Sequence, residues 1–185
     1  MANTKDNIEK AKNKFDIINQ WISNCDTKSS FLLAFYGVLL TLVFTSNIIK
    51  KIITTFSLKP SLSDIGWIEI LNLLSLLSIL AFFFFSIKCL YFIYNTLKAR
   101  IDASIYQQED LNTDSKIFFL DIANKAYKEF KNNSNSETDD DYLNDLNSQV
   151  FINSNIATEK FKAYNKSLLN AFIGIICLAI YIIIA

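Results

Sequence analysis

The apolar residues of this chain are concentrated in three runs, which cover residues 31–46, 65–87 and 168–185. Each run reaches or approaches the ~20 residues that a helix needs to cross about 30 Å of hydrocarbon. One long polar block separates the second run from the third. The pattern predicts an all-α membrane protein with three transmembrane helices, a helical insert and a long C-terminal helix that runs into the last span.

The segment before the first run is amphipathic. Its apolar residues recur every three or four positions from Ile8 to Ile22, and Trp21 lies near its end. This spacing predicts a helix that packs against a neighbour or lies at the membrane surface. The first run is short for a span, so we expect one continuous helix to extend through it as far as Ile49.

The connection between the first two runs contains the chain's single proline, Pro60. Residues 47–64 are therefore expected to form a short loop outside the membrane, with Ser63 or Asp64 as the N-cap of the second span. That second helix is expected to continue past the membrane to Ile101.

The polar block has two predicted parts. Residues 115–131 carry a helical stripe of apolar side chains, and residues 132–141 form an acidic, low-complexity stretch that is typical of a mobile linker. From Tyr142 a second stripe, with Asn153 at an inward position, runs without a break into the last span. It predicts one rod of about 45 residues, which can transmit a movement or form a coiled-coil seam between protomers.

Positive charge sets the expected orientation, because lysine and arginine favour the cytoplasmic side. The N-terminus and the polar block would lie there, with the first loop outside. The larger basic group comprises Lys10, Lys12, Lys14, Lys28, Lys98, Arg100, Lys160, Lys162 and Lys166, against Lys50, Lys51 and Lys59 in the loop. The expected division is an N-terminal helix at 1–28, a two-span hairpin at 29–96, a cytoplasmic region at 97–166 with its linker at 132–141, and a final span at 167–185.

Composition narrows the chemistry. The chain has no histidine, three isolated cysteines and a formal net charge of zero. It therefore lacks the commonest general base and metal ligand, and it has no bulk basic field for nucleic acid. We find no nucleophile–base pair and no glycine-rich phosphate loop. The sequence predicts no enzyme, no catalytic residue, no resident cofactor, no metal site and no cleaved signal peptide.

Three segments, taken in order, resemble the membrane effector family of bacterial Pycsar (pyrimidine cyclase) antiphage systems. They are WISNCDTKSSFLLAFYGVLL at 21–40, SKIFFLDIA at 115–123 and QVFINSNIATEKFKAYN at 149–165. In the second segment, Leu120 and Asp121 replace an expected Gly-His pair. The resemblance implies a cell inner membrane protein that is activated by a cyclic nucleotide from a partner cyclase, forms homo-oligomers in the lipid bilayer and impairs membrane integrity during phage infection.

A cyclic mononucleotide needs donors for its phosphate, an aromatic surface and polar groups that read the base edge. The candidate ligand-binding residues within the matching segments are Asp26, Lys28, Lys116, Phe118, Gln149, Asn153, Ser154, Lys160 and Tyr164. Each has a structural alternative: solvated or snorkelling lysines, packed aromatic rings, and a buried interhelical hydrogen bond for Asn153 and Ser154. The candidate contacts of the membrane helices are Asn72, Ser75, Ser78 and Gly174.

The first functional hypothesis is thus a ligand-gated membrane effector of antiviral defence. A second is a membrane effector gated by another nucleotide messenger or by a protein partner. A third is a constitutive small channel or scaffold, whose conductance or assembly needs no ligand.

Overall fold

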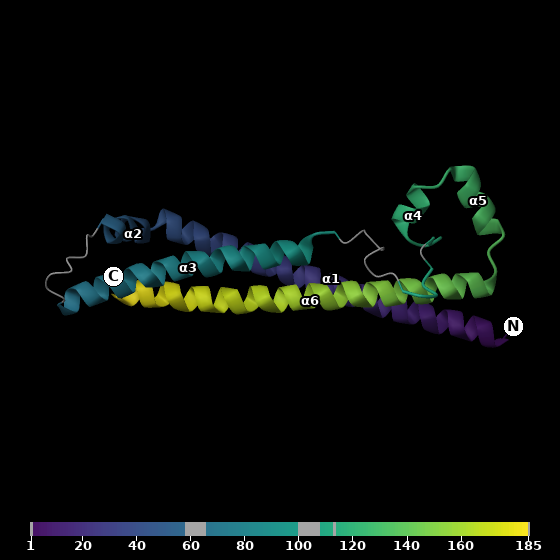
Figure 1. The fold of residues 1–185 in the computed structure, drawn as a ribbon, viewed down its shortest axis with the longest axis horizontal. Coiled ribbons are helices and arrows are strands. Elements are labelled where there is room, and N and C mark those ends of the chain that lie inside the picture. The colour runs from purple at the N-terminus through teal and green to yellow at the C-terminus, as the bar shows by residue number, and fades with distance from the viewer. Residues whose placement is uncertain (1, 58–65, 100–107, 113, 185) are drawn as a thin grey trace. The chain divides into compact units, whose positions relative to one another are not determined.

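The computed structural model describes residues 2–57, 66–99, 108–112 and 114–184 (Figure 1). Every regular element in these ranges is a helix, which confirms the all-α class. The helices are α1 (Ala2–Thr45), α2 (Ile48–Ser57), α3 (Trp67–Leu97), α4 (Phe119–Ala123), α5 (Tyr127–Asn135) and α6 (Asp139–Ile184). Three of them, α1, α3 and α6, are long and apolar enough to cross a membrane.

Helix α1 joins the amphipathic segment and the first apolar run in one unbroken helix of 44 residues, as predicted. Its expected extension to Ile49 is wrong, because the helix ends at Thr45. The Ser46 hydroxyl explains the break: it donates to the carbonyl of Val43 at 3.4 Å and accepts the N–H of Ile48 at 3.3 Å. One side chain therefore ends α1 and starts α2.

Helix α2 stands where a loop was expected. Its apolar and polar residues alternate with helical period, so Ile52 and Thr55 are buried while Lys50 and Lys51 are exposed. The Thr55 hydroxyl also lies 3.5 Å from that of Tyr181 on α6. The amphipathic pattern of these ten residues forms a helix ahead of Pro60, the residue that suggested a loop.

Helix α3 follows Gly66, whose N–H donates to the Glu69 carboxylate at 2.6 Å in the first turn. This bond satisfies one of the free amide groups at the start of the helix. The expected caps Ser63 and Asp64, and Pro60 with them, lie outside the described residues. At its other end α3 stops at Leu97, and the described residues Lys98 and Ala99 are not helical, so the expected uninterrupted extension to Ile101 is wrong. Ile101 itself lies outside the described residues.

The single helix expected over residues 115–131 is instead two short helices. Residues 115–118 form a turn before α4, and Ala126 is extended, with φ −65° and ψ 141°, before α5 begins. Side-chain acceptors hold the turn, as described below. The helical spacing of the apolar residues did not reveal that local hydrogen bonds would divide this segment into two helices.

Helix α6 runs for 46 residues and confirms the predicted rod that leads into the last span. It begins at Asp139, so the acidic stretch at 132–141 is helical at both of its ends. Thr138 and Asp141 form a reciprocal cap: the Thr138 hydroxyl donates to the Asp141 carboxylate at 2.7 Å and accepts the Asp141 N–H at 3.2 Å. Such a pair satisfies free amides at a helix start.

This cap makes the start of α6 sensitive to pH. The hydrogen bonds from Thr138 hold the pKa of Asp141 below its ordinary value of 3.8. A carboxyl group whose pKa is lower in the folded protein than in the unfolded chain stabilises the fold at pH values above its unfolded pKa. This stabilisation is lost as the pH falls through the folded pKa. Thr138→Ala should therefore speed amide exchange at residues 139–142 more at pH 6 than at pH 2, where only the bond from the Asp141 N–H to the Thr138 hydroxyl remains to be lost, as followed by hydrogen–deuterium exchange. Equal acceleration at both pH values would contradict this assignment.

The chain divides into two compact units. The first comprises residues 1–26 and 98–161, and the second comprises residues 27–97 and 162–185. Helices α1 and α6 each contribute to both units.

In the second unit, α1, α3 and α6 share an apolar core. Tyr36, Cys89, Ile93 and Ala171 form one buried cluster, and a second cluster gathers Val43, Ile52, Ile79, Phe82, Leu178 and Tyr181. Large apolar side chains such as Phe35, Leu77 and Ile176 remain exposed on the outside of the helices. An apolar exterior of this kind suits a surface that faces lipid.

Candidate functional site

In the first unit, the polypeptide before α4 is hydrogen-bonded to buried polar side chains of α6. The Asn112 N–H donates to the Ser148 hydroxyl at 3.0 Å, and the Lys116 N–H donates to Asp145 Oδ2 at 2.7 Å. Ser148 and Asp145 are both buried. The bonds therefore place the second family-like segment directly on the polar face of α6 that leads into the third.

The turn at 115–118 is fixed by its own side chains. Ser115 is fully buried, and its hydroxyl accepts the N–H groups of Ile117 and Phe118 at 3.1 and 2.9 Å. The Ser115 N–H in turn donates to Asp121 Oδ2 at 3.0 Å. Asp121 stands where the resemblance led us to expect histidine, and here its carboxylate anchors the turn.

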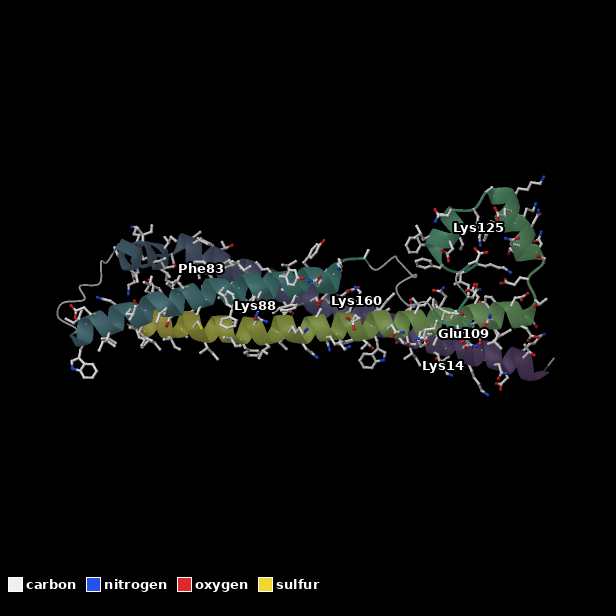
Figure 2. The ribbon with its side chains drawn as sticks, viewed as in Figure 1. Lys14, Phe83, Lys88, Glu109, Lys125 and Lys160 are labelled. Carbon is white, nitrogen blue, oxygen red and sulfur yellow. The ribbon has the colours of Figure 1, made fainter. Side chains whose placement is uncertain are left out.

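Two ion pairs flank this turn. Lys116 Nζ lies 3.6 Å from Glu137 Oε1, and Lys125 Nζ lies 2.6 Å from Asp114 Oδ1. Lys125, labelled in Figure 2, lies on the connection of α4 to α5 and is mostly buried. Asp114 is exposed, so the Lys125–Asp114 pair positions the short helices more than it stabilises them. Both members of the Lys116–Glu137 pair are mostly buried.

Elsewhere in the first unit, α1 and α6 are paired through polar contacts. The Asn153 amide donates to Asn19 Oδ1 at 2.9 Å, which matches the structural alternative for this residue. Further along, Lys160 Nζ lies 2.6 Å from Asp26 Oδ1, and Lys160 is labelled on α6 in Figure 2. The Lys160 side chain is only 6% exposed against 39% for Asp26, so the pair lies at the edge of the packed interior.

The other predicted ligand-binding residues differ in their surroundings and in the unit to which they belong. Gln149 is buried on α6, whereas the Ser154 hydroxyl donates to the Val150 carbonyl of its own helix at 2.7 Å. Phe118 is half-buried, and its ring centroid lies 4.9 Å from that of Phe119. Lys28 and Tyr164 belong to the second unit. The first unit thus contains seven of the nine predicted residues: Asp26, Lys116, Phe118, Gln149, Asn153, Ser154 and Lys160.

Sequence reasoning missed four residues that build the site: Ser115, Asp121, Asp145 and Ser148. The pattern does contain a signal for two of them. Asp145, Ser148 and Gln149 recur at spacings of three and four around buried Leu146, which puts polar groups on the inward face of a helix. A polar residue at an inward position needs a partner, and here the partners are backbone N–H groups of the turn.

The predicted contacts of the membrane helices lie in the second unit. Ser75 and Ser78 are buried on α3, and the Ser75 hydroxyl donates to the Asn72 carbonyl at 2.9 Å. Gly174 on α6 packs so closely that an added Cβ would lie 2.9 Å from the Tyr36 hydroxyl oxygen. Glycine at this position allows the helices to approach one another.

Comparison with known proteins gives two matches. Residues 10–185 match the Pycsar effector protein domain, PycTM. The chain is also 39% identical, over 161 residues, to the Pycsar effector protein GmPycTM of Gulbenkiania mobilis, an alignment that covers 85% of this chain and 82% of that protein. No solved structure gives a significant match.

Proposed function

Because this chain belongs to the family of Pycsar effector proteins, whose members act in antiviral defence, we propose that it is a ligand-gated membrane effector. In this proposal a cyclic pyrimidine mononucleotide, made by a partner cyclase, binds the first unit. The bound form assembles into homo-oligomers and impairs the integrity of the cell inner membrane. The N-terminus and the insert face the cytoplasm, where the nucleotide is made.

The observation that carries this proposal is the placement of the turn at 115–118 on α6. It brings Lys116, Phe118 and Gln149, which two separate family-like segments supply, into one unit with buried Asp145. A nucleotide offers a phosphate, an aromatic base and polar base edges. A cation, an aromatic ring and an acceptor–donor pair of side chains are the groups that can recognise them.

Gating requires a ligand that binds one state of the protein better than the other. Helices α1 and α6 contribute to both units, so a change in how they pair in the first unit also involves residues of the second. Ligand that replaces contacts of the turn at 115–118 would shift this pairing. The chemistry needed is binding alone, so the proposed effector is not an enzyme.

The test is dye release from liposomes that contain the purified full-length protein. We expect release with a cyclic pyrimidine mononucleotide and none without ligand. Lys116→Gln, which removes the ammonium group beside the turn, should raise the half-maximal concentration about tenfold, a typical loss for one charge-assisted contact. Lys128→Gln on the exposed face of α5 is the matched control and should respond as the natural chain does.

Two results would contradict the proposal. Release without any ligand would indicate a constitutive channel. Silence toward all cyclic mono-, di- and trinucleotides would instead indicate a protein partner.

A further inference from the structure

Asp145 on α6 has a carboxylate oxygen for which the described part of the chain supplies no donor. The residue is 1% exposed. Its Oδ2 accepts the Lys116 N–H at 2.7 Å, whereas its Oδ1 is buried and makes no hydrogen bond. A buried acceptor without a donor destabilises the state that contains it, so such an atom calls for a functional explanation.

The backbone N–H groups of the turn at 115–118 are already used. The Ser115 N–H is bonded to Asp121, and the N–H groups of Ile117 and Phe118 are bonded to the Ser115 hydroxyl. The Lys116 ammonium group is paired with the Glu137 carboxylate. A donor for Asp145 Oδ1 would therefore come from outside this set of groups, and a bound molecule can supply it.

We propose that Asp145 Oδ1 accepts an N–H of the base of the activating nucleotide, and that this base carries an exocyclic amine. The inference rests on the proposed function and adds the identity of the base. Carboxylates accept from the N4 amine of cytosine, one of the standard side-chain pairings with base edges. Uracil presents a carbonyl oxygen at the same position, and its N3–H donor lies between two carbonyl oxygens that the negative carboxylate repels. The ligand class is thus a cyclic cytidine mononucleotide.

The same atom links binding to a change of state. In this structure Oδ1 is covered, so a base that reaches it must displace the turn at 115–118, which Asp145 itself holds through Lys116. The ligand gains a hydrogen bond that the resting state lacks. That difference in contacts between two states is what a population shift requires.

Asp145→Asn separates the base-reading role from a structural one. An asparagine carbonyl can still accept the Lys116 N–H, while its amide group replaces Oδ1 by a donor. We expect the full-length natural protein to bind cyclic CMP about tenfold more tightly than cyclic UMP by isothermal titration calorimetry, since one good contact to a base edge discriminates by at least this factor. Asp145→Asn should reverse the order.

Asp140→Asn is the matched control, because it makes the same change at an exposed carboxylate in the first turn of the same helix and leaves Asp145 in place. It should keep the preference for cyclic CMP. A cyclic CMP with both N4 hydrogens replaced by methyl groups tests the same contact without any mutation, and should bind the natural protein about tenfold more weakly than cyclic CMP.

The outcomes are distinct. If the natural protein binds neither nucleotide, the proposed function fails and this inference fails with it. If it binds cyclic CMP but Asp145→Asn keeps the same order, or the methylated ligand binds equally well, only the role of Asp145 is overturned. A preference of the natural protein for cyclic UMP also overturns it.

Discussion

Gly174→Leu is expected to push α6 away from its neighbours and to destabilise the second unit. Already the Cβ would lie 2.9 Å from the Tyr36 hydroxyl oxygen, 3.6 Å from Phe85 Cβ and 3.8 Å from the Phe82 carbonyl oxygen. Overpacking of this kind costs about 1–3 kcal/mol and sometimes more. The measurement is the unfolding midpoint in mixed micelles with increasing SDS, which should fall clearly below that of the natural chain.

Gly37 offers the matched control, because a Cβ built there meets nothing within 4 Å. Gly37→Leu should leave the midpoint unchanged or raise it, since glycine is a poor helix former. The milder Gly174→Ala should be partly rescued by Tyr36→Phe, which removes the oxygen that the new Cβ meets. Equal effects at the two glycines, or no rescue in the double variant, would show that the packing of Gly174 does not limit the bundle.

Removing either partner of the Asp26–Lys160 pair is expected to have unequal effects. Asp26→Asn takes away the carboxylate 2.6 Å from an ammonium group whose side chain is 6% exposed. Breaking a fully buried pair costs about 3–5 kcal/mol, and the accessible edge at Asp26 reduces our expectation to about 1–3 kcal/mol. Lys160→Met should cost less, because it removes the buried charge and leaves a carboxylate that water can reach.

An exposed pair in the same helix serves as the reference. Lys10 and Asp6 form an ion pair four residues apart on the surface of α1. Asp6→Asn should change stability by no more than about 0.5 kcal/mol. Thermal unfolding in detergent, followed by circular dichroism, compares the three variants. The assignment is overturned if Asp26→Asn is as mild as Asp6→Asn, or if Lys160→Met is the more damaging of the pair.

Periodicity predicted the long helices because the apolar spacing of a long helix repeats over many turns of the sequence. The joining of the N-terminal segment to the first span, and of the stripe after Tyr142 to the last span, follow from apolar spacing kept over many turns. Short elements depend on single side chains. Ser46 ends α1, and Ser115 with Asp121 delays α4, through bonds that no average over a window reveals.

The candidate site shows the same division. The sequence marked Asp26, Lys160 and Asn153 as candidate ligand-binding residues, and Asn153 also as a polar residue at an inward position that needs a partner. It could not pair them, because the contact between Asp26 and Lys160 joins positions 134 residues apart and depends on how α1 and α6 align. Asp145 escaped notice among its acidic neighbours, and only the packing of the turn distinguishes it.

Three buried hydroxyl and amide groups of the second unit are bonded within their own helices. Ser86 donates to the carbonyl of Phe82, Ser167 to that of Tyr164, and Asn170 to that of Lys166. These bonds survive when one helix slides or turns against another. A rearrangement of the helices in lipid therefore exchanges dispersion contacts for others of similar strength. These polar groups keep their hydrogen bonds throughout, so they add little to the barrier to repacking.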